Sequence, residues 1–162
     1  MAAAGQTRLR VLVVENEMWL RIDAEETLLD LGHDVVGWAS RARTAIAEAR
    51  RVRPDFVLMD IQLDGVRDGI ETARIIRDTY GIPSLFVTGS TDAALQKRAM
   101  ETQPLGYLQK PIVRSELRSA LERFAEAQTA DDMPSLGLVR QFNDPAPELP
   151  SSVQTLWKGE SE

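Results

Sequence analysis

Short apolar runs alternate with longer segments of helical periodicity along most of the chain. The apolar runs are rich in aliphatic and β-branched residues, and they predict five buried strands at residues 9–14, 35–38, 55–59, 83–87 and 105–108. Helices are predicted at residues 17–31, from Ser40 to Pro54, from Asp68 through Ile76, at 91–102 and at 113–127. Because strands and helices alternate with short connections, we expect an α/β fold with a parallel sheet covered on both faces.

Local signals mark where the predicted helices begin and end. Gly32 lies just past the first helix, where glycine is favoured. Ser40 is expected to cap the second helix. Asp68, followed three residues later by Glu71, has the form of a capping box for the third. His33 is the only histidine of the chain, and we expect it to be an exposed turn residue.

The chain is expected to contain one domain. Its 162 residues fit a domain of about 100–150 residues with an additional segment. We place the domain at residues 8–127, after a flexible N-terminus at residues 1–7. Residues 129–162 hold four prolines and no sustained periodicity, so residues 128–162 are predicted to form a C-terminal tail that is partly disordered or docks elsewhere. Trp157 in this tail is either a docking anchor or an incidental aromatic.

Composition and charge narrow the function classes. The net charge is −6 and no block of Lys and Arg stands out, which argues against binding to a phosphate backbone. The absence of cysteine excludes disulfides and thiolate metal sites. No apolar run approaches the roughly 18 residues of a membrane span, and residues 1–5 lack the regions of a signal peptide. We therefore expect a cytoplasmic protein that contacts neither nucleic acid nor membrane.

Chemically useful side chains follow four of the five predicted strands. Glu15 and Asn16 follow the first strand, Asp60 ends the third, and Thr88 and Lys110 end the fourth and fifth. A buried strand does not need these groups for packing. Ligands of open α/β sheets bind beyond the carboxyl ends of the strands. We therefore expect these five side chains to meet in one pocket.

The residue types in this predicted pocket suit phosphate chemistry. Glu15, Asn16 and Asp60 offer hard oxygen ligands for Mg²⁺ or Mn²⁺, and a dication would remove the repulsion between the two carboxylates. Lys110 supplies a compact positive charge for a phosphate, and Thr88 can donate a hydroxyl hydrogen bond. A carboxylate can form an acyl phosphate when cations neutralise the incoming oxygens, so Asp60 is the candidate nucleophile.

Four segments in order resemble the response-regulator receiver (CheY-like) family. They are residues 13–17, 58–63, 87–89 and 106–111, and their order and spacing agree over roughly residues 8–127. The resemblance implies a doubly wound, flavodoxin-like parallel sheet of five strands in the order 2-1-3-4-5, with five helices. It also implies a phosphoacceptor signalling domain of a two-component system or phosphorelay rather than an enzyme acting on other substrates.

The resemblance also assigns roles to individual residues. Asp60 would accept a phosphoryl group from a phosphohistidine of a sensor histidine kinase, and Thr88 and Lys110 would contact its oxygens. Tyr107 occupies the position of the family's rotating aromatic, although an ordinary half-buried strand residue is the alternative. The Lys110–Pro111 bond is expected to be cis. The metal, Mg²⁺ or Mn²⁺, would be held by Asp60, the side-chain oxygen of Asn16 and the backbone carbonyl of Gln62, with Glu15 acting through a water molecule.

Two departures from the family pattern stand out. Asn16 replaces the usual second acid after the first strand, so we expect weaker metal binding and less efficient phosphorylation. Residues 86–90, Phe-Val-Thr-Gly-Ser, partly match a subgroup with a Phe-Ala-Thr-Gly-Tyr motif. Members of that subgroup are mostly stand-alone receivers in phosphorelays. No output domain is predicted after the receiver, so the expected partners besides the kinase are a downstream protein or histidine phosphotransfer protein, with a homodimer as a further alternative.

Three other functions stay open. A degenerate receiver would bind partners without phosphorylation. The replacement of the usual second acid by Asn16 favours this alternative. An Asp-nucleophile phosphohydrolase would need a second Asp two residues after Asp60, where the chain has Gln62. A flavodoxin-like cofactor binder should carry a hydroxyl- and glycine-rich loop after the first strand, where the chain has acids that would repel a phosphate.

Overall fold

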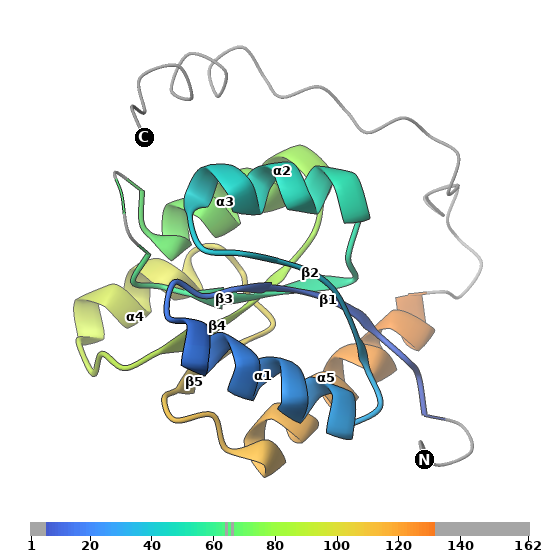
Figure 1. The fold of residues 1–162 in the computed structure, drawn as a ribbon. Coiled ribbons are helices and arrows are strands. Elements are labelled where there is room, and N and C mark those ends of the chain that lie inside the picture. Colours follow the sequence, from blue (N-terminus) through green and yellow to red (C-terminus); the bar gives the residue numbers. More distant parts are fainter. Residues whose placement is uncertain (1–5, 64, 66, 132–162) are drawn as a thin grey trace.

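Five strands and five helices alternate strictly along the part of the chain that the structure describes, residues 6–63, 65 and 67–131 of a computed structural model (Figure 1). The elements are β1 (Arg10–Val14), α1 (Met18–Asp30), β2 (Asp34–Ala39), α2 (Ala42–Val52), β3 (Phe56–Asp60), α3 (Gly69–Tyr80), β4 (Ser84–Thr88), α4 (Ala93–Met100), β5 (Gly106–Gln109) and α5 (Arg114–Asp131). The alternation expected from the hydrophobic pattern is therefore confirmed.

The strands form a single parallel sheet in the order β2-β1-β3-β4-β5, as the resemblance implies. The chain moves from β1 to one edge at β2, returns to β3 on the other side of β1, and continues outward to β5. The order therefore reverses between β1 and β3. Crevices for ligands open at such a reversal, beyond the carboxyl ends of the strands.

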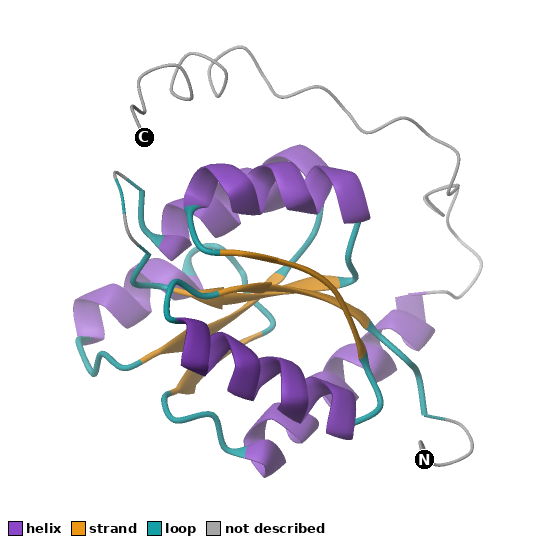
Figure 2. Ribbon diagram, viewed as in Figure 1, coloured by secondary structure: helices purple, strands orange, loops and turns teal. Residues whose placement is uncertain are grey.

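Helices cover both faces of the sheet, as Figure 2 shows. The helices α1 and α5 lie on one face, and α2 and α3 lie on the other, with α4 joining that side through its buried Ala99. Successive residues of a strand point to opposite faces, so Leu12 and Val14 pack into one core cluster while Val11 and Val13 pack into the other. Burial on both faces explains why the strands are continuous apolar runs.

The ends of several helices differ from the sequence-based expectation. The prediction that Ser40 caps α2 is wrong, because Arg41 occupies the cap position and makes no side-chain cap bond. The cap of α3 is confirmed, since the Asp68 carboxylate accepts from the backbone N–H of Glu71 at 2.9 Å. The helix α5 continues to Asp131, past residue 127, where we placed the domain boundary. Most of the predicted tail, including Trp157, lies outside the described residues.

The expectation that His33 is exposed is wrong. Only 4% of its surface is exposed, and its Nδ1 accepts the backbone N–H of Leu9 at 3.2 Å. Gly32, with φ of 89°, turns the chain after α1 and brings His33 beneath the start of β1. Burial lowers the pKa of His33, Arg8 lowers it further and Asp34 opposes the shift. The imidazole is therefore a neutral structural acceptor.

No helix among the residues described is long and apolar enough to cross a membrane.

Candidate functional site

The predicted polar residues gather at the carboxyl edge of the sheet. Glu15 and Asn16 directly follow β1, Asp60 is the last residue of β3, and Lys110 directly follows β5. Each lies there because an apolar strand ends at that point and the chain leaves the core. Glu15 and Asp60 are nevertheless 7% and 3% exposed, so both carboxylates are buried at the rim of the sheet.

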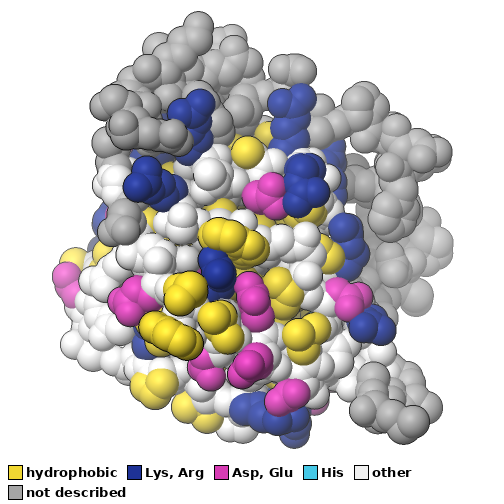
Figure 3. Space-filling model, viewed as in Figure 1, with side chains coloured by type: hydrophobic (Ala, Val, Ile, Leu, Met, Phe, Trp, Pro, Cys, Tyr) yellow, Lys and Arg dark blue, Asp and Glu magenta, His cyan; other side chains and the backbone are white. Residues whose placement is uncertain are grey.

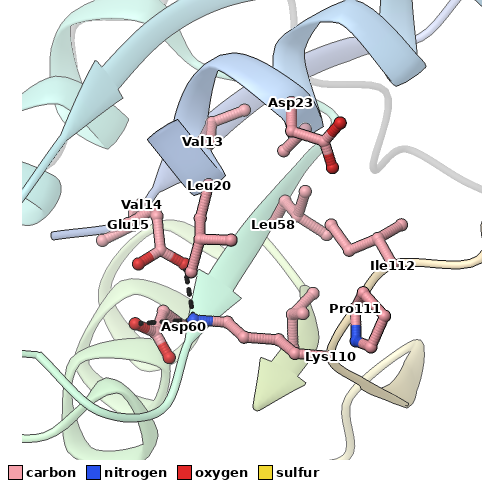
Figure 4. Close-up of a pocket in the computed structure, with 12 residues that line it drawn as sticks. Val13, Val14, Glu15, Leu20, Asp23, Leu58, Asp60, Lys110, Pro111 and Ile112 are labelled. Carbon is pink, nitrogen blue, oxygen red and sulfur yellow. Dashed lines mark ion pairs between the residues drawn. The ribbon is translucent and has the colours of Figure 1, made fainter. Parts of the chain in front are cut away.

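The ammonium group of Lys110 joins the two buried carboxylates (Figure 4). Its Nζ lies 2.8 Å from Oε2 of Glu15 and 3.4 Å from Oδ2 of Asp60. The backbone N–H of Lys110 donates to the carbonyl of Thr88, which continues the strand pairing one residue beyond β5. This bond holds the backbone of Lys110 at the carboxyl edge of the sheet, from which its side chain extends toward Asp60 and Glu15. The Lys110–Pro111 bond is cis, as expected. The closer contact to Glu15 was not foreseen from the sequence.

Asn16 and the backbone of Gln62 complete the polar cluster. One polar atom of the Asn16 amide lies 3.1 Å from Oε1 of Glu15, 3.1 Å from Oδ2 of Asp60 and 3.3 Å from the carbonyl oxygen of Gln62. The backbone N–H of Gln62 also donates to Oδ1 of Asp60 at 3.1 Å. The four residues that we predicted as metal ligands are therefore brought together.

The donor set of this cluster fits a hard divalent cation. Two carboxylates, an amide oxygen and a backbone carbonyl are the ligands that Mg²⁺ accepts, and its remaining positions are filled by water or a substrate oxygen. Within the described residues, no three His, Cys, Asp or Glu side chains form a group that could hold a metal. The site therefore depends on its two neutral oxygens as well as on Glu15 and Asp60.

Burial and the second carboxylate change the ionisation of Asp60. Burial raises the pKa of Asp60 to about 7, with a further increase from Glu15 and an opposing effect of Lys110 and of the Gln62 N–H. Burial alone would lower the pKa of Lys110, but its bonds to Glu15 and the charge of Asp60 raise it instead. Lys110 thus stays charged at neutral pH, whereas Asp60 is poised between its acid and its carboxylate form.

An apolar pocket lies on one side of these charges. It is lined by Val13, Val14, Glu15, Leu20, Asp23, Ala24, Leu58, Asp60, Val87, Lys110, Pro111 and Ile112 (Figure 4). These side chains shield one flank of the Asp60–Lys110 pair from water. Electrostatic interactions are stronger in such a low-dielectric setting.

Thr88 and Tyr107 lie next to each other on neighbouring strands. Thr88 follows Val87, the residue of β4 that pairs with Asp60, and it is fully buried. Its hydroxyl accepts the backbone N–H of Ser90 at 3.2 Å. Burial raises the pKa of Tyr107, and the nearby Thr88 hydroxyl opposes that shift. The Tyr107 hydroxyl is buried and makes no well-aligned hydrogen bond among the described residues, so its ring lies inward against the core.

Gly69 is a residue of the site that the sequence reasoning missed. Its backbone N–H donates to the carbonyl of Ile61 at 2.7 Å, which places the first turn of α3 directly against the end of β3. A Cβ on Gly69 would overlap the backbone of Asp60. The dipeptide Asp68-Gly69, a cap followed by glycine at a helix start, is the local signal that could have revealed this close approach.

Comparison with known proteins agrees with this arrangement. The family model described as the response regulator receiver domain matches residues 11–122. A curated relative, the transcriptional regulatory protein PdtaR of Mycobacterium tuberculosis, is 34% identical over 113 residues, which are 70% of this chain and 55% of PdtaR. The DNA-binding response regulator MtrA of Mycobacterium leprae is 32% identical over 130 residues, 79% of this chain and 55% of MtrA. The chain thus spans about half the length of these relatives.

Solved structures give the same result. The signal receiver domain of a modulated diguanylate cyclase from Desulfovibrio desulfuricans is 32% identical, with a TM-score of 0.72 over 78% of this chain and 100% of that chain. A two-component response regulator of the LuxR family from Aurantimonas is 31% identical, with a TM-score of 0.67 over 74% of this chain and 87% of that chain.

Proposed function

Because the chain belongs to the response regulator receiver domain family of two-component systems, we propose that it accepts a phosphoryl group on the carboxylate of Asp60 from a phosphohistidine of a sensor kinase. A receiver is a phosphoacceptor signalling module and not an enzyme that turns over other substrates. The observation that supports Asp60 most directly is the Lys110 ammonium group, 3.4 Å from its Oδ2 and 2.8 Å from Glu15.

The proposed step is an in-line transfer between two nucleophiles. An oxygen of Asp60 forms a bond to phosphorus while the bond from phosphorus to the imidazole nitrogen breaks, and the electron pair of that bond returns to the imidazole. Lys110 lies where its charge can stabilise the phosphoryl oxygens, and the Thr88 hydroxyl can donate to one of them. The apolar wall that includes Leu20 keeps water from one flank of the reacting atoms.

Receivers of this family typically use Mg²⁺, and we propose that Glu15, Asn16, Asp60 and the Gln62 carbonyl hold it, or Mn²⁺, here. When bound, the cation neutralises charge on Asp60 and on the incoming phosphoryl oxygens. Asp60, with its pKa raised to about 7, needs such neutralisation to react as a carboxylate near neutral pH.

The output follows from the residues next to the site. A phosphoryl group adds about −1.5 to −2 charges, which would draw the Thr88 hydroxyl toward Asp60 and favour the inward position of Tyr107. Tyr107 also borders a groove formed by residues of β5, α4, α5 and the segment before α4, which we propose as the surface that binds a downstream protein or a histidine phosphotransfer protein. A homodimer through this surface is a further outcome of the same switch.

The two mycobacterial relatives are named for transcriptional regulation and DNA binding. The match covers about half of each relative, so these activities are not assigned to this chain. With a net charge of −6 and no basic cluster, we propose that this chain binds proteins in the cytoplasm and not nucleic acid or membrane.

The test is phosphotransfer followed by intact-mass measurement. Wild type incubated with a cognate kinase or acetyl phosphate and Mg²⁺ should gain the mass of one phosphoryl group, and Asp60→Asn should gain none. Asp78→Asn, which removes an exposed carboxylate from α3, is the matched control and should behave as wild type. Equal labelling of wild type and Asp60→Asn, or no labelling of either, contradicts the proposal.

A second function, protein binding without phosphorylation, is favoured by one observation. Asn16 stands where the family resemblance predicts a second acid, so the site has two carboxylates in place of three. A protein that shows no Mg²⁺ binding at millimolar concentrations, yet retains a partner equally well with Asp60→Asn, would support this second function.

A further inference from the structure

The Asn16 amide lies at the centre of three hydrogen-bond acceptors. Its inward-facing atom is 3.1 Å from Oε1 of Glu15, 3.1 Å from Oδ2 of Asp60 and 3.3 Å from the Gln62 carbonyl oxygen. The nitrogen and oxygen of an amide are distinguished by the partners that they meet. An inward oxygen would face only other oxygens, whereas an inward nitrogen donates hydrogen bonds to its neighbours, two of them charged acceptors.

The remaining carboxylate oxygens have donors of their own. Oε2 of Glu15 accepts from Lys110, and Oε1 accepts the backbone N–H of Glu17 at 3.1 Å. Oδ1 of Asp60 accepts the backbone N–H of Gln62. With the nitrogen of Asn16 inward, each oxygen of the two buried carboxylates therefore has at least one donor. Such a network holds the acidic cluster together without a cation.

We propose that the NH₂ group of Asn16 donates hydrogen bonds to the acceptors of this site in the metal-free protein. A divalent cation binds only when the amide rotates so that its oxygen faces the site. The inference rests on the metal site named in the proposed function and adds a switch specific to this chain. A carboxylate at position 16 could not make it, because an ionised carboxylate has no hydrogen to donate.

The switch lowers cation affinity in two ways. Asn16 supplies no charge to the ion, and ligand charge is one determinant of affinity at oxygen sites. In addition, only the fraction of molecules with the amide turned is competent to bind, and the apparent dissociation constant rises in inverse proportion to that fraction. The chain would thus be phosphorylated only where the Mg²⁺ concentration is high enough to turn the amide.

The direct test follows the side-chain amide of Asn16 by NMR, with its two proton signals identified by their loss in Asn16→Ala. In EDTA these protons should exchange with water at least about tenfold more slowly than those of Gln96, an exposed amide on α4. Saturating Mg²⁺ should remove the protection. Fast exchange in EDTA, or protection that persists when the backbone N–H of Gln62 has shifted with bound Mg²⁺, overturns the inference.

Substitutions at position 16 separate the donor from the ligand. In EDTA, Asn16→Ala and Asn16→Asp should both lower the melting temperature, by about 3 °C or more, because each removes the donor. In Mg²⁺, the melting temperature of Asn16→Asp should return to that of wild type. This variant should also bind the ion about tenfold more tightly than wild type. An unchanged or raised melting temperature of Asn16→Ala in EDTA contradicts a donating amide.

These outcomes distinguish the inference from the function on which it rests. If Mg²⁺ shifts the NMR signal of the Gln62 N–H and supports labelling of Asp60, but the exchange rate of the Asn16 amide protons does not change, only the switch is wrong. If Mg²⁺ leaves Gln62 unchanged and Asp60 is not labelled, both the metal site and the switch are wrong.

Discussion

Gly69 lies directly against the backbone carbonyl of Asp60, so close that a Cβ at position 69 would overlap it. The contact joins the start of α3 to the end of β3, and the backbone N–H of Gly69 donates to the carbonyl of Ile61 at 2.7 Å in the same place. The first turn of α3 therefore packs directly against the end of the strand that precedes it. The Gln62 carbonyl, two residues after Asp60, lies 3.3 Å from the Asn16 amide.

Gly69→Ala should destabilise the protein by about 2–3 kcal/mol, because the added methyl group meets backbone and not a movable side chain. Urea unfolding measures the effect. Gly89→Ala is the matched control, since a Cβ there meets nothing within 4 Å, and it should change stability by less than about 0.5 kcal/mol. Equal effects of the two substitutions would show that the contact with Asp60 is not tight.

Asp60→Asn should stabilise the metal-free protein at pH 8. Because the pKa of Asp60 is raised to about 7 from 3.8, the folded protein keeps this proton over a range where the unfolded chain has lost it. Wild type therefore loses stability as pH rises from about 4 to about 7. The variant avoids this loss, so its stability relative to wild type should rise between pH 4 and pH 8.

Thermal unfolding in EDTA across this range provides the measurement. Asp78→Asn, on the exposed surface of α3, should show no such trend. A difference between wild type and Asp60→Asn that is independent of pH would mean that burial and Glu15 do not raise the pKa of Asp60.

His33→Asn should remove a loss of stability on acidification. The folded pKa of His33 is lowered, mainly by burial, so the unfolded chain takes up a proton below about pH 6.5 before the folded protein does. Wild type therefore loses stability relative to the variant as pH falls below about 6.5. The loss levels off once the pH is below the lowered pKa of the folded protein. Asn keeps an acceptor for the backbone N–H of Leu9 but does not titrate.

The relative stabilities can be measured by urea unfolding at fixed pH values from 8 down to 5. Asp60 makes both proteins more stable as pH falls, and this contribution cancels when the stability of His33→Asn is compared with that of wild type. A constant difference over this range would show that the imidazole is not desolvated as its position beneath β1 implies.

Trp19→Ala should weaken phosphotransfer from a kinase and leave labelling by acetyl phosphate unchanged. Trp19 is 76% exposed and Met18 is 53% exposed, and both begin α1 beside Asn16. Figure 3 shows the face on which α1 lies in front, where hydrophobic side chains gather among acidic ones. A protein that brings a phosphohistidine to Asp60 must approach this edge, and exposed tryptophans are frequent anchors of interfaces.

We expect a loss of roughly tenfold or more in kcat/KM for the kinase-dependent reaction. Leu29→Ala, which removes an exposed apolar side chain from the far end of α1, is the control and should have a smaller effect. Equal loss with acetyl phosphate would place the defect in the site itself and not in docking.

Much of the fold could be predicted because its determinants are local. A buried strand is a run of apolar residues, and the residue that ends the run marks the carboxyl edge of the sheet, as Glu15, Asp60 and Lys110 do. The cap at Asp68 was also recognisable from four consecutive residues. His33 was misjudged because its position after Gly32 is typical of a turn, and its burial depends on Leu9, which lies 24 residues earlier.

The sequence by itself determined the alternation of strands and helices, the edge at which the polar residues gather and the chemistry that they have in common. Only the tertiary structure decided how those residues pair. Lys110 lies nearer to Glu15 than to Asp60, the Asn16 amide faces three acceptors, and Gly69 touches the backbone of Asp60. Periodicity reflects interactions over a few residues, whereas these contacts join atoms up to 95 positions apart and depend on how strands and loops pack.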